Sequence, residues 1–243
     1  MCCSTGCKSL PIPPPHKELP VTDKIVLPRT FSQQTVTSHY AAVAWFYDLW
    51  AWLTEDKAVQ RAFRLADIHD GMDILEVAVG TGRLFRKIVE HNPSGRNEGI
   101  DLSPDMLARA RKRLSRAPAA SWNVQTGSAF GLPFPDHSFD RVFNTYMFDL
   151  LPVEDFPKAL SEFQRVLRPG GRLVLVNFGF GERWYNGFWY WLAKHFPALL
   201  TNCRPVRPRQ AVERAGLDVV HIEAVSQNTF PSEVIIASKG TGA

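Results

Sequence analysis

The residues best suited to bind a ligand lie in the segment 73–82, Asp-Ile-Leu-Glu-Val-Ala-Val-Gly-Thr-Gly, and roughly twenty residues after it. Gly80 and Gly82 allow backbone to approach a ligand closely, and free N–H groups opening a following helix favour a negatively charged group there. Asp101 ends the next apolar run, at the spacing where a carboxylate accepts hydrogen bonds from ribose hydroxyls. Together these residues indicate a ligand that carries a carboxylate and a ribose.

Two common nucleotide ligands fit this pattern poorly. A dinucleotide-binding turn needs a third glycine three residues after the second, and Phe85 occupies that position. The chain also lacks the lysine-bearing phosphate loop of ATP-binding proteins. A ligand without phosphate groups remains, and S-adenosylmethionine fits both requirements.

The elements that must position these residues alternate between strands and helices. Residues 73–79 read as a buried strand, and the apolar residues of 83–89 repeat at helical spacing. Ser103 followed by Pro104 is a normal helix start, and Arg168-Pro169-Gly170-Gly171 reads as a helix stop and chain reversal. Further strands are predicted at 98–102, 122–126, 140–145, 173–178, 218–225 and 233–238, and further helices at 57–68, 104–115, 156–167 and 210–215. The sequence therefore predicts an α/β fold.

Four motifs in order resemble one enzyme family. They are residues 75–82, 99–107, 132–140 and 165–171, which read LEVAVGTG, GIDLSPDML, LPFPDHSFD and RVLRPGG. The chain resembles class I methyltransferases from about Tyr40 to Lys239, most of all the UbiE/MenG-type quinone methyltransferases and the bacterial phosphatidylethanolamine N-methyltransferases. The resemblance implies a Rossmann-like fold: a seven-stranded, mostly parallel sheet with a reversed C-terminal hairpin, helices on both faces, an N-terminal helical flap and an aromatic lid after the fifth strand.

The same resemblance implies S-adenosylmethionine as cofactor and a set of residues that contact it. Tyr47, in a Tyr-Asp pair of the flap segment, is the candidate for a hydroxyl reaching the cofactor carboxylate, although a plain amphipathic helix explains the segment equally well. Ser128 stands where the family commonly has an acid that holds the adenine amino group. The implied cofactor-binding residues are Tyr47, Glu76, Ala78, Gly80, Thr81, Gly82, Asp101, Leu102, Met106, Ser128, Ala129 and Asn144.

The strand predicted at 140–145 delivers the segment 144–149 to the carboxyl edge of the sheet, where open parallel sheets bind ligands. Methyl transfer needs a base only when the acceptor loses a proton. Asp149 is the first candidate for that base and Tyr146 the second. A helix cap or a surface charge is an equally good interpretation of Asp149.

Residues 179–208 hold an unusual density of large apolar side chains, including Trp184, Phe188 and Trp191. One interpretation is an ordinary packed helix pair. The other is a lid over an apolar acceptor that dips into a membrane surface, with the basic loop 204–209 meeting lipid phosphates.

Composition bounds the remaining possibilities. With 243 residues and 45% hydrophobic content, we expect one domain at 38–243 after a proline-rich extension at 1–37. A net charge of +4 is too small to predict nucleic-acid binding, and no apolar run is long enough to span a membrane. A cytoplasmic protein, peripheral to the membrane at most, is the expectation. Cys2, Cys3, Cys7 and Cys203 form no recognised zinc pattern, so no metal is predicted.

The sequence leaves three functions open. The first is methyl transfer to a small or lipid-like hydrophobic acceptor, such as a quinone precursor or an aminophospholipid. The second keeps the cofactor and changes the acceptor to a thiol or a metalloid, because the segment running into Thr201-Asn202-Cys203 also resembles membrane-attached thiol methyltransferases and the N-terminal cysteines suit soft ions. The third is a non-catalytic scaffold, against which the intact Gly80, Gly82 and Asp101 argue.

Overall fold

A mixed seven-stranded sheet organises the protein. The structure, a computed structural model, describes residues 26–27, 52–115, 122–200 and 202–241. The strand order is β3-β2-β1-β4-β5-β7-β6, in which the first five strands are parallel to one another and β7 is antiparallel to both β5 and β6. The predicted reversed C-terminal hairpin is confirmed. The strands are β1 (Asp73–Val77), β2 (Arg96–Asp101), β3 (Trp122–Thr126), β4 (Phe139–Thr145), β5 (Leu167–Phe178), β6 (Leu217–Gln227) and β7 (Phe230–Lys239).

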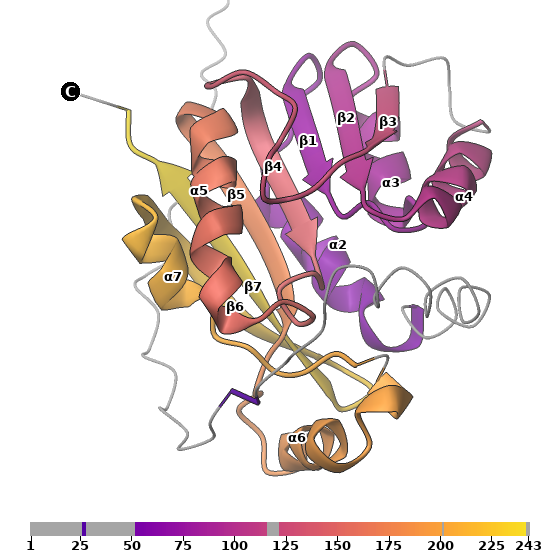
Figure 1. Ribbon diagram of the computed structural model, residues 1–243, viewed down its shortest axis with the longest axis vertical. Coiled ribbons are helices and arrows are strands. Elements are labelled where there is room, and N and C mark those ends of the chain that lie inside the picture. The colour runs from indigo at the N-terminus through magenta and orange to yellow at the C-terminus, as the bar shows by residue number, and fades with distance from the viewer. Residues whose placement is uncertain (1–25, 28–51, 116–121, 201, 242–243) are drawn as a thin grey trace, which may run out of the picture.

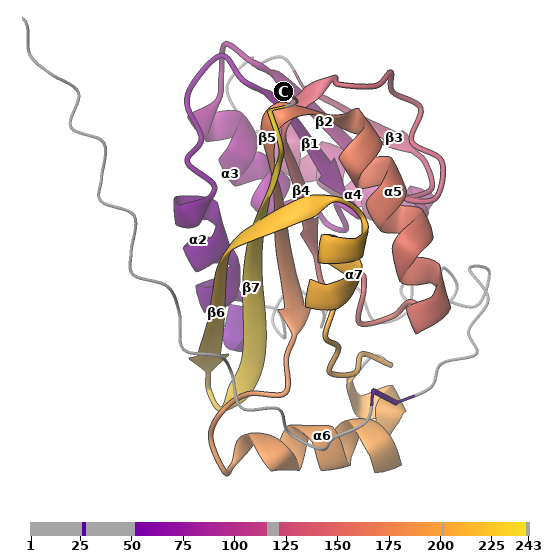
Figure 2. The ribbon, with the colours of Figure 1, turned by 90° about the vertical axis from the view of Figure 1, so that its left-hand side faces the viewer.

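Helices cover both faces of this sheet (Figures 1 and 2). On one face, residues of α2 and α3 share a hydrophobic cluster with Val174 and Val176 of β5, and on the other, residues of α5 and α7 share one with Leu173 and Leu175. Because both faces are covered, residues 173–176 of β5 form a continuous apolar run without polar alternation. The helices are α2 (Asp56–Leu65), α3 (Arg83–His91), α4 (Pro104–Leu114), α5 (Phe156–Val166), α6 (Asn186–His195) and α7 (Arg209–Arg214), with short 3-10 turns η1 (Val153–Asp155) and η2 (Pro197–Leu200).

One predicted boundary is wrong. The helix predicted at 156–167 ends at Val166 as expected, but the reversal expected at 168–171 lies inside β5, which begins at Leu167, six residues before the predicted start at Leu173. Leu167 already adopts an extended backbone and pairs with Phe139, and the ladder with β4 is then interrupted before it resumes at Arg172. The Pro-Gly-Gly residues therefore form a bulge-like irregularity in the ladder between β4 and β5, where proline and glycine are tolerated.

The region 179–208 lies beyond the carboxyl ends of the parallel strands, where α6 crosses under the sheet (Figure 2). The side chains of Trp184, Phe188, Trp191, Phe196 and Leu199 are all exposed. Trp189, in contrast, turns inward and packs edge-on against Phe230 of β7. Across the described part of the chain, no helix combines the length and the apolarity that crossing a membrane requires.

Candidate functional site

The turn between β1 and α3 holds three residues in the left-handed backbone region. Ala78, Gly80 and Gly82 have φ values of 62°, 55° and 77°. Gly82 is also the N-cap of α3, and a Cβ added to it would lie 3.0 Å from the Cβ of Ala110 in α4. Both the backbone conformation and the lack of space therefore require glycine at position 82. Ala78 adopts a left-handed conformation that is energetically unfavourable for residues with a Cβ.

Asp101 fixes this turn from the neighbouring strand. Its Oδ2 accepts a hydrogen bond of 2.7 Å from the Gly80 N–H, and its Oδ1 accepts one of 2.9 Å from the Ser103 N–H. Burial raises the pKa of Asp101, and these backbone donors act in the opposite direction. Each carboxylate oxygen keeps a second lone pair, so the group can still accept hydrogen bonds from a ligand.

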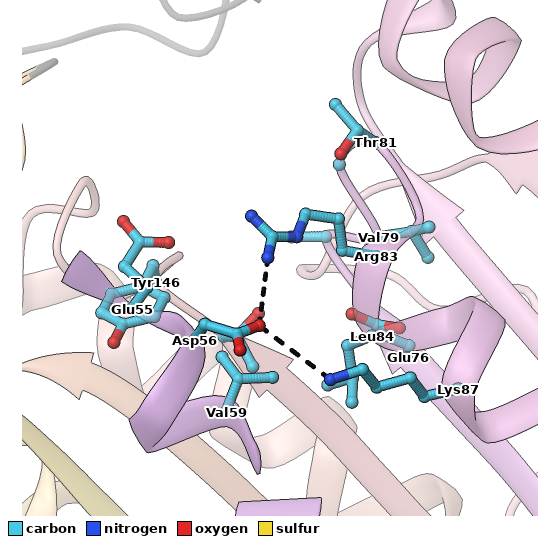
Figure 3. Close-up of a pocket in the computed structure, with 13 residues that line it drawn as sticks. Glu55, Asp56, Val59, Glu76, Val79, Thr81, Arg83, Leu84, Lys87 and Tyr146 are labelled. Atoms are coloured by element: carbon cyan, nitrogen blue, oxygen red, sulfur yellow. Dashed lines mark hydrogen bonds and ion pairs between the residues drawn. The ribbon is translucent and has the colours of Figure 1, made fainter. Parts of the chain in front are cut away.

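A pocket opens between this turn, α2, α3 and the end of β4 (Figure 3). Four of the residues that the resemblance assigned to the cofactor line it, namely Glu76, Ala78, Gly80 and Thr81. The other lining residues are Glu55, Asp56, Val59, Val79, Arg83, Leu84, Lys87, Thr145 and Tyr146.

Ion pairs across the pocket join α2 to α3. Asp56 Oδ1 lies 3.0 Å from Arg83 Nη2 and 3.9 Å from Lys87 Nζ, as the dashed lines in Figure 3 mark. Such partly exposed pairs contribute little to stability, of the order of 1 kcal/mol or less. Their effect is positional, because they hold the first turn of α2 against the cofactor turn.

The environment of Glu76 shows whether the pocket has the polarity that S-adenosylmethionine requires. Its side chain is fully buried, its Oε2 has no hydrogen-bond partner, and burial and then the charge of Asp101 raise its pKa well above the usual range. A buried acceptor without a partner is costly unless a ligand supplies a donor. The ammonium group and positive sulfur of S-adenosylmethionine supply such complementary charge, so the residues present fit this cofactor.

The remaining expected cofactor residues are more scattered. Leu102 and Met106 lie at the start of α4, with Leu102 exposed and Met106 buried. Ser128 Oγ accepts a hydrogen bond of 3.2 Å from the Phe130 N–H, and the adjacent Ala129 packs into the core. Asn144 donates 2.9 Å to the carbonyl of Val77, which ties β4 to β1 and leaves its own Oδ1 without a partner. Tyr47 lies outside the described residues.

The two candidate bases occupy different positions. Tyr146 lines the pocket, and its hydroxyl lies 2.7 Å from Ser232 Oγ. Burial and then the charge of Glu55 raise its pKa well above the usual range. Asp149 is not among the lining residues and is fully buried. Its Oδ2 accepts a hydrogen bond of 2.9 Å from the Phe178 N–H, and its Oδ1 has no partner.

The interpretation of Asp149 as a helix cap or a surface charge is therefore wrong. The chain folds back between β4 and α5, so this acid sits beneath the end of β5. Burial raises the pKa of Asp149 to about 8. A carboxyl group with a pKa near neutrality suits proton exchange with a substrate.

Sequence reasoning missed the acids at the start of α2. Glu55 is buried in the pocket wall, and burial and then the nearby charge of Asp149 raise its pKa to about 8. The adjacent pair Glu55-Asp56 at a helix start was a visible signal, because acids are enriched in first turns. That signal said nothing about the pocket, which only the packing of α2 on α3 creates. Within the described ranges, no cluster of three potential metal ligands occurs.

Comparison with known proteins agrees with this geometry. Residues 74–171 match the protein-family model described as a methyltransferase domain. This chain contains a class I methyltransferase domain. S-adenosylmethionine is the cofactor that such a domain implies.

The relatives of this methyltransferase domain include quinone-modifying enzymes. The ubiquinone/menaquinone biosynthesis C-methyltransferase UbiE of Paracoccus denitrificans is 41% identical over 113 residues, which cover 45% of this chain and 44% of the relative. The UbiE protein of Hahella chejuensis is 34% identical over 177 residues, covering 67% and 64%. The chain thus spans from under half to just under two thirds of these curated relatives.

A solved structure shares the fold at low sequence identity. It is a Haloferax volcanii protein, described as a methyltransferase, in complex with the Trm112 methyltransferase activator. It is 20% identical with a TM-score of 0.68, over 87% of this chain and 99% of that one. Identity this low supports the fold of the methyltransferase domain and leaves its acceptor open.

Proposed function

We propose that the protein transfers a methyl group from S-adenosylmethionine to a hydroxylated apolar ring of the quinone-precursor type. The pocket between the glycine turn and α2 carries this proposal, because it combines a constrained turn, a strand-end carboxylate and the unpartnered oxygen of buried Glu76. The names of the relatives supply the acceptor class.

The residues of this chain act mainly by position. S-adenosylmethionine, when bound, supplies a methyl group made electrophilic by positive sulfur. The Asp56 to Arg83 and Lys87 pairs hold α2 against the turn, which keeps water from the reacting atoms. Proximity alone contributes of the order of 7–11 kcal/mol to such a displacement.

Methylation of a ring carbon also releases one proton. As the bond from carbon to sulfur breaks and the new carbon bond forms, the ring loses the hydrogen that the methyl group replaces. Asp149, whose Oδ1 has no partner among the described residues, is our candidate to take it in its ionised form, a minor fraction at neutral pH that grows as pH rises toward its pKa of about 8. Tyr146 suits this task less, because its raised pKa keeps the phenol protonated.

A lipid-like acceptor also fits the surface beside the site. Trp184 is 91% exposed, and four further large apolar side chains of the region 179–208 are about half exposed or more. We propose that this face contacts the membrane surface from which the acceptor enters, because exposed aromatic clusters mark interaction sites and suit bilayer interfaces.

The test is transfer of an isotope-labelled methyl group into acceptors presented in lipid vesicles. We expect labelled product with a demethylated naphthoquinol, identified by mass spectrometry as ring-methylated. Vesicles containing phosphatidylethanolamine and a soluble thiol serve as competing acceptors. Label found only in the aminolipid or the thiol would contradict the ring acceptor and leave methyl transfer standing, whereas no label in any acceptor would contradict the enzyme function itself.

A further inference from the structure

Two buried polar side chains and one half-buried acid lie at the carboxyl ends of β4 and β5 and the amino end of β7, away from the residues that line the cofactor pocket. They are Asp149, Asn177 and Glu233. Asn177 and Glu233 are directly opposite in the β5 and β7 ladder, so their side chains share one face. Asp149 accepts from the N–H of Phe178, which places its carboxyl beside the Asn177 peptide.

These side chains leave four polar atoms without hydrogen-bond partners among the described residues. Both the Oδ1 and the Nδ2 of Asn177 lack a partner, although the side chain is fully buried. Asp149 Oδ1 and Glu233 Oε1 are equally unpartnered. Buried carboxamides are almost always satisfied, so a cluster of this kind points to a bound group that satisfies it.

The electrostatics of the three residues indicate mutual proximity. Glu233 is among the groups that raise the pKa of Asp149, after the main effect of burial. Burial raises the pKa of Glu233 itself to about 7, against the charges of Arg207 and Arg209. Arg204, fully buried, donates 2.8 Å to the carbonyl of Asp149 and so fixes the backbone of this acid.

The unpartnered atoms define the chemistry of the missing group. Three of them are oxygens that accept hydrogen bonds from a donor, and the fourth, Asn177 Nδ2, needs an acceptor. An ammonium group only donates, so it would leave Nδ2 unsatisfied. A phosphate or carboxylate only accepts, and it would face two acids. A hydroxyl group accepts and donates at one atom, so a single such group can accept from Asn177 Nδ2 and donate to one of the neighbouring oxygens.

We infer that Asp149, Asn177 and Glu233 form a recognition site for a hydroxyl group on the methyl acceptor. The inference rests on the proposed function for the identity of the ligand as the acceptor. It names Asn177 and Glu233 as specificity residues that neither the motifs nor the cofactor pocket indicate. The segment 204–207 is hydrogen-bonded beside these residues, because Arg204 donates to the carbonyl of Asp149 and the Val206 N–H donates 3.0 Å to the carbonyl of Phe178.

Replacing Asn177 by leucine separates ligand recognition from a structural role. Removing an unsatisfied buried amide in favour of an apolar side chain of similar size should leave Tm unchanged or raise it. Asn97 is the matched control, since it is equally buried but bonded through both amide atoms to Asn92 at 2.9 and 3.0 Å. We expect Asn97→Leu to lower Tm clearly.

The binding measurement uses the full chain with S-adenosylhomocysteine, under reducing conditions, and two probes. They are 1,4-naphthohydroquinone and its dimethyl ether, which keeps the ring and the oxygens but cannot donate. We expect wild type to prefer the hydroquinone by about tenfold, and Asn177→Leu to lose that preference. Glu233→Gln, which keeps the size and one acceptor oxygen, should weaken the preference less.

Two results would overturn the inference. One is a loss of stability in Asn177→Leu as large as that in Asn97→Leu, and the other is equal binding of the two probes by wild type. Failure of the proposed function would give a different result. Wild type would still prefer the hydroquinone and the two leucine variants would show the expected Tm values, but no labelled methyl group would reach any ring acceptor.

Discussion

The two halves of the carboxyl edge of the sheet satisfy their buried polar groups in opposite ways. At the ends of β1 and β2, each oxygen of Asp101 accepts from a backbone N–H, and Gly80 and Ser103 are the donors. At the ends of β4, β5 and β7, Asp149, Asn177 and Glu233 leave four polar atoms unpartnered. The Asp101 carboxylate of the cofactor half is thus satisfied by the chain itself, whereas Glu76 and Asn144 each keep one oxygen without a partner among the described residues.

This difference explains why the cofactor half is easily recognised and the acceptor half is not. A constrained turn that binds an unchanging cofactor needs particular residues at particular spacings, and those form the motifs. A site that is completed only by its acceptor follows the chemistry of that acceptor, which varies while the scaffold stays the same. Three predictions test this contrast, from the largest expected effect to the smallest.

Asp101→Ala should strongly weaken cofactor binding. The carboxylate both anchors the turn at Gly80 and offers lone pairs to the ribose, so we expect affinity for S-adenosylhomocysteine to fall by about 100-fold or more in calorimetric titration. Asp105→Ala, in the exposed first turn of α4, is the control and should bind within about threefold of wild type. Comparable binding by both variants would mean that Asp101 does not hold the ligand.

Asp149→Asn should change how stability depends on pH in the acceptor half. Burial raises the pKa of Asp149 from 3.8 to about 8 in the folded protein, so between these values the folded state holds a proton that the unfolded state has lost. The stability contributed by the neutral form is full below pH 4 and is lost as pH rises toward 8.

An asparagine mimics that neutral form at every pH and can still accept from the Phe178 N–H. We therefore expect the free energy of unfolding of the variant, relative to that of wild type, to rise by on the order of 3 kcal/mol between pH 4 and pH 8.5. Urea denaturation at each pH measures this difference. Asp218→Asn, at an exposed position of β6, should show no such trend. A constant difference between Asp149→Asn and wild type would show that this acid stays ionised.

Gly82→Ala and Gly216→Ala should separate close packing from backbone conformation. Both glycines have a φ near +78°, at 77° and 79°, but a Cβ at Gly82 would meet Ala110 at 3.0 Å and one at Gly216 would meet nothing within 4 Å. We expect Gly216→Ala to lower the free energy of unfolding by about 1 kcal/mol, and Gly82→Ala to lower it by about 1–3 kcal/mol more. Thermal denaturation measures both losses. Equal losses would show that α4 moves away freely, and the cofactor half would be less rigid than proposed.

Much of the fold could be predicted because it depends on local patterns. The apolar run 73–77, the glycines after it and the Ser103-Pro104 helix start each determine their conformation through neighbouring residues, and the structure confirms these elements. The start of β5 was missed because proline and glycine usually end regular structure, whereas here they lie in an irregular ladder with β4 that no local pattern reveals.

The sequence by itself determined the class of the sheet, the glycine turn and the place of Asp101 at the end of the next strand, since local spacing and backbone conformation govern all three. Only the tertiary structure decided which acids are buried. Glu55, Asp149 and Glu233 lie far apart in the chain, and their raised pKa values arise when α2, the end of β4 and the C-terminal hairpin close over them. Desolvation depends on what packs above a group, so it becomes visible only when distant segments meet.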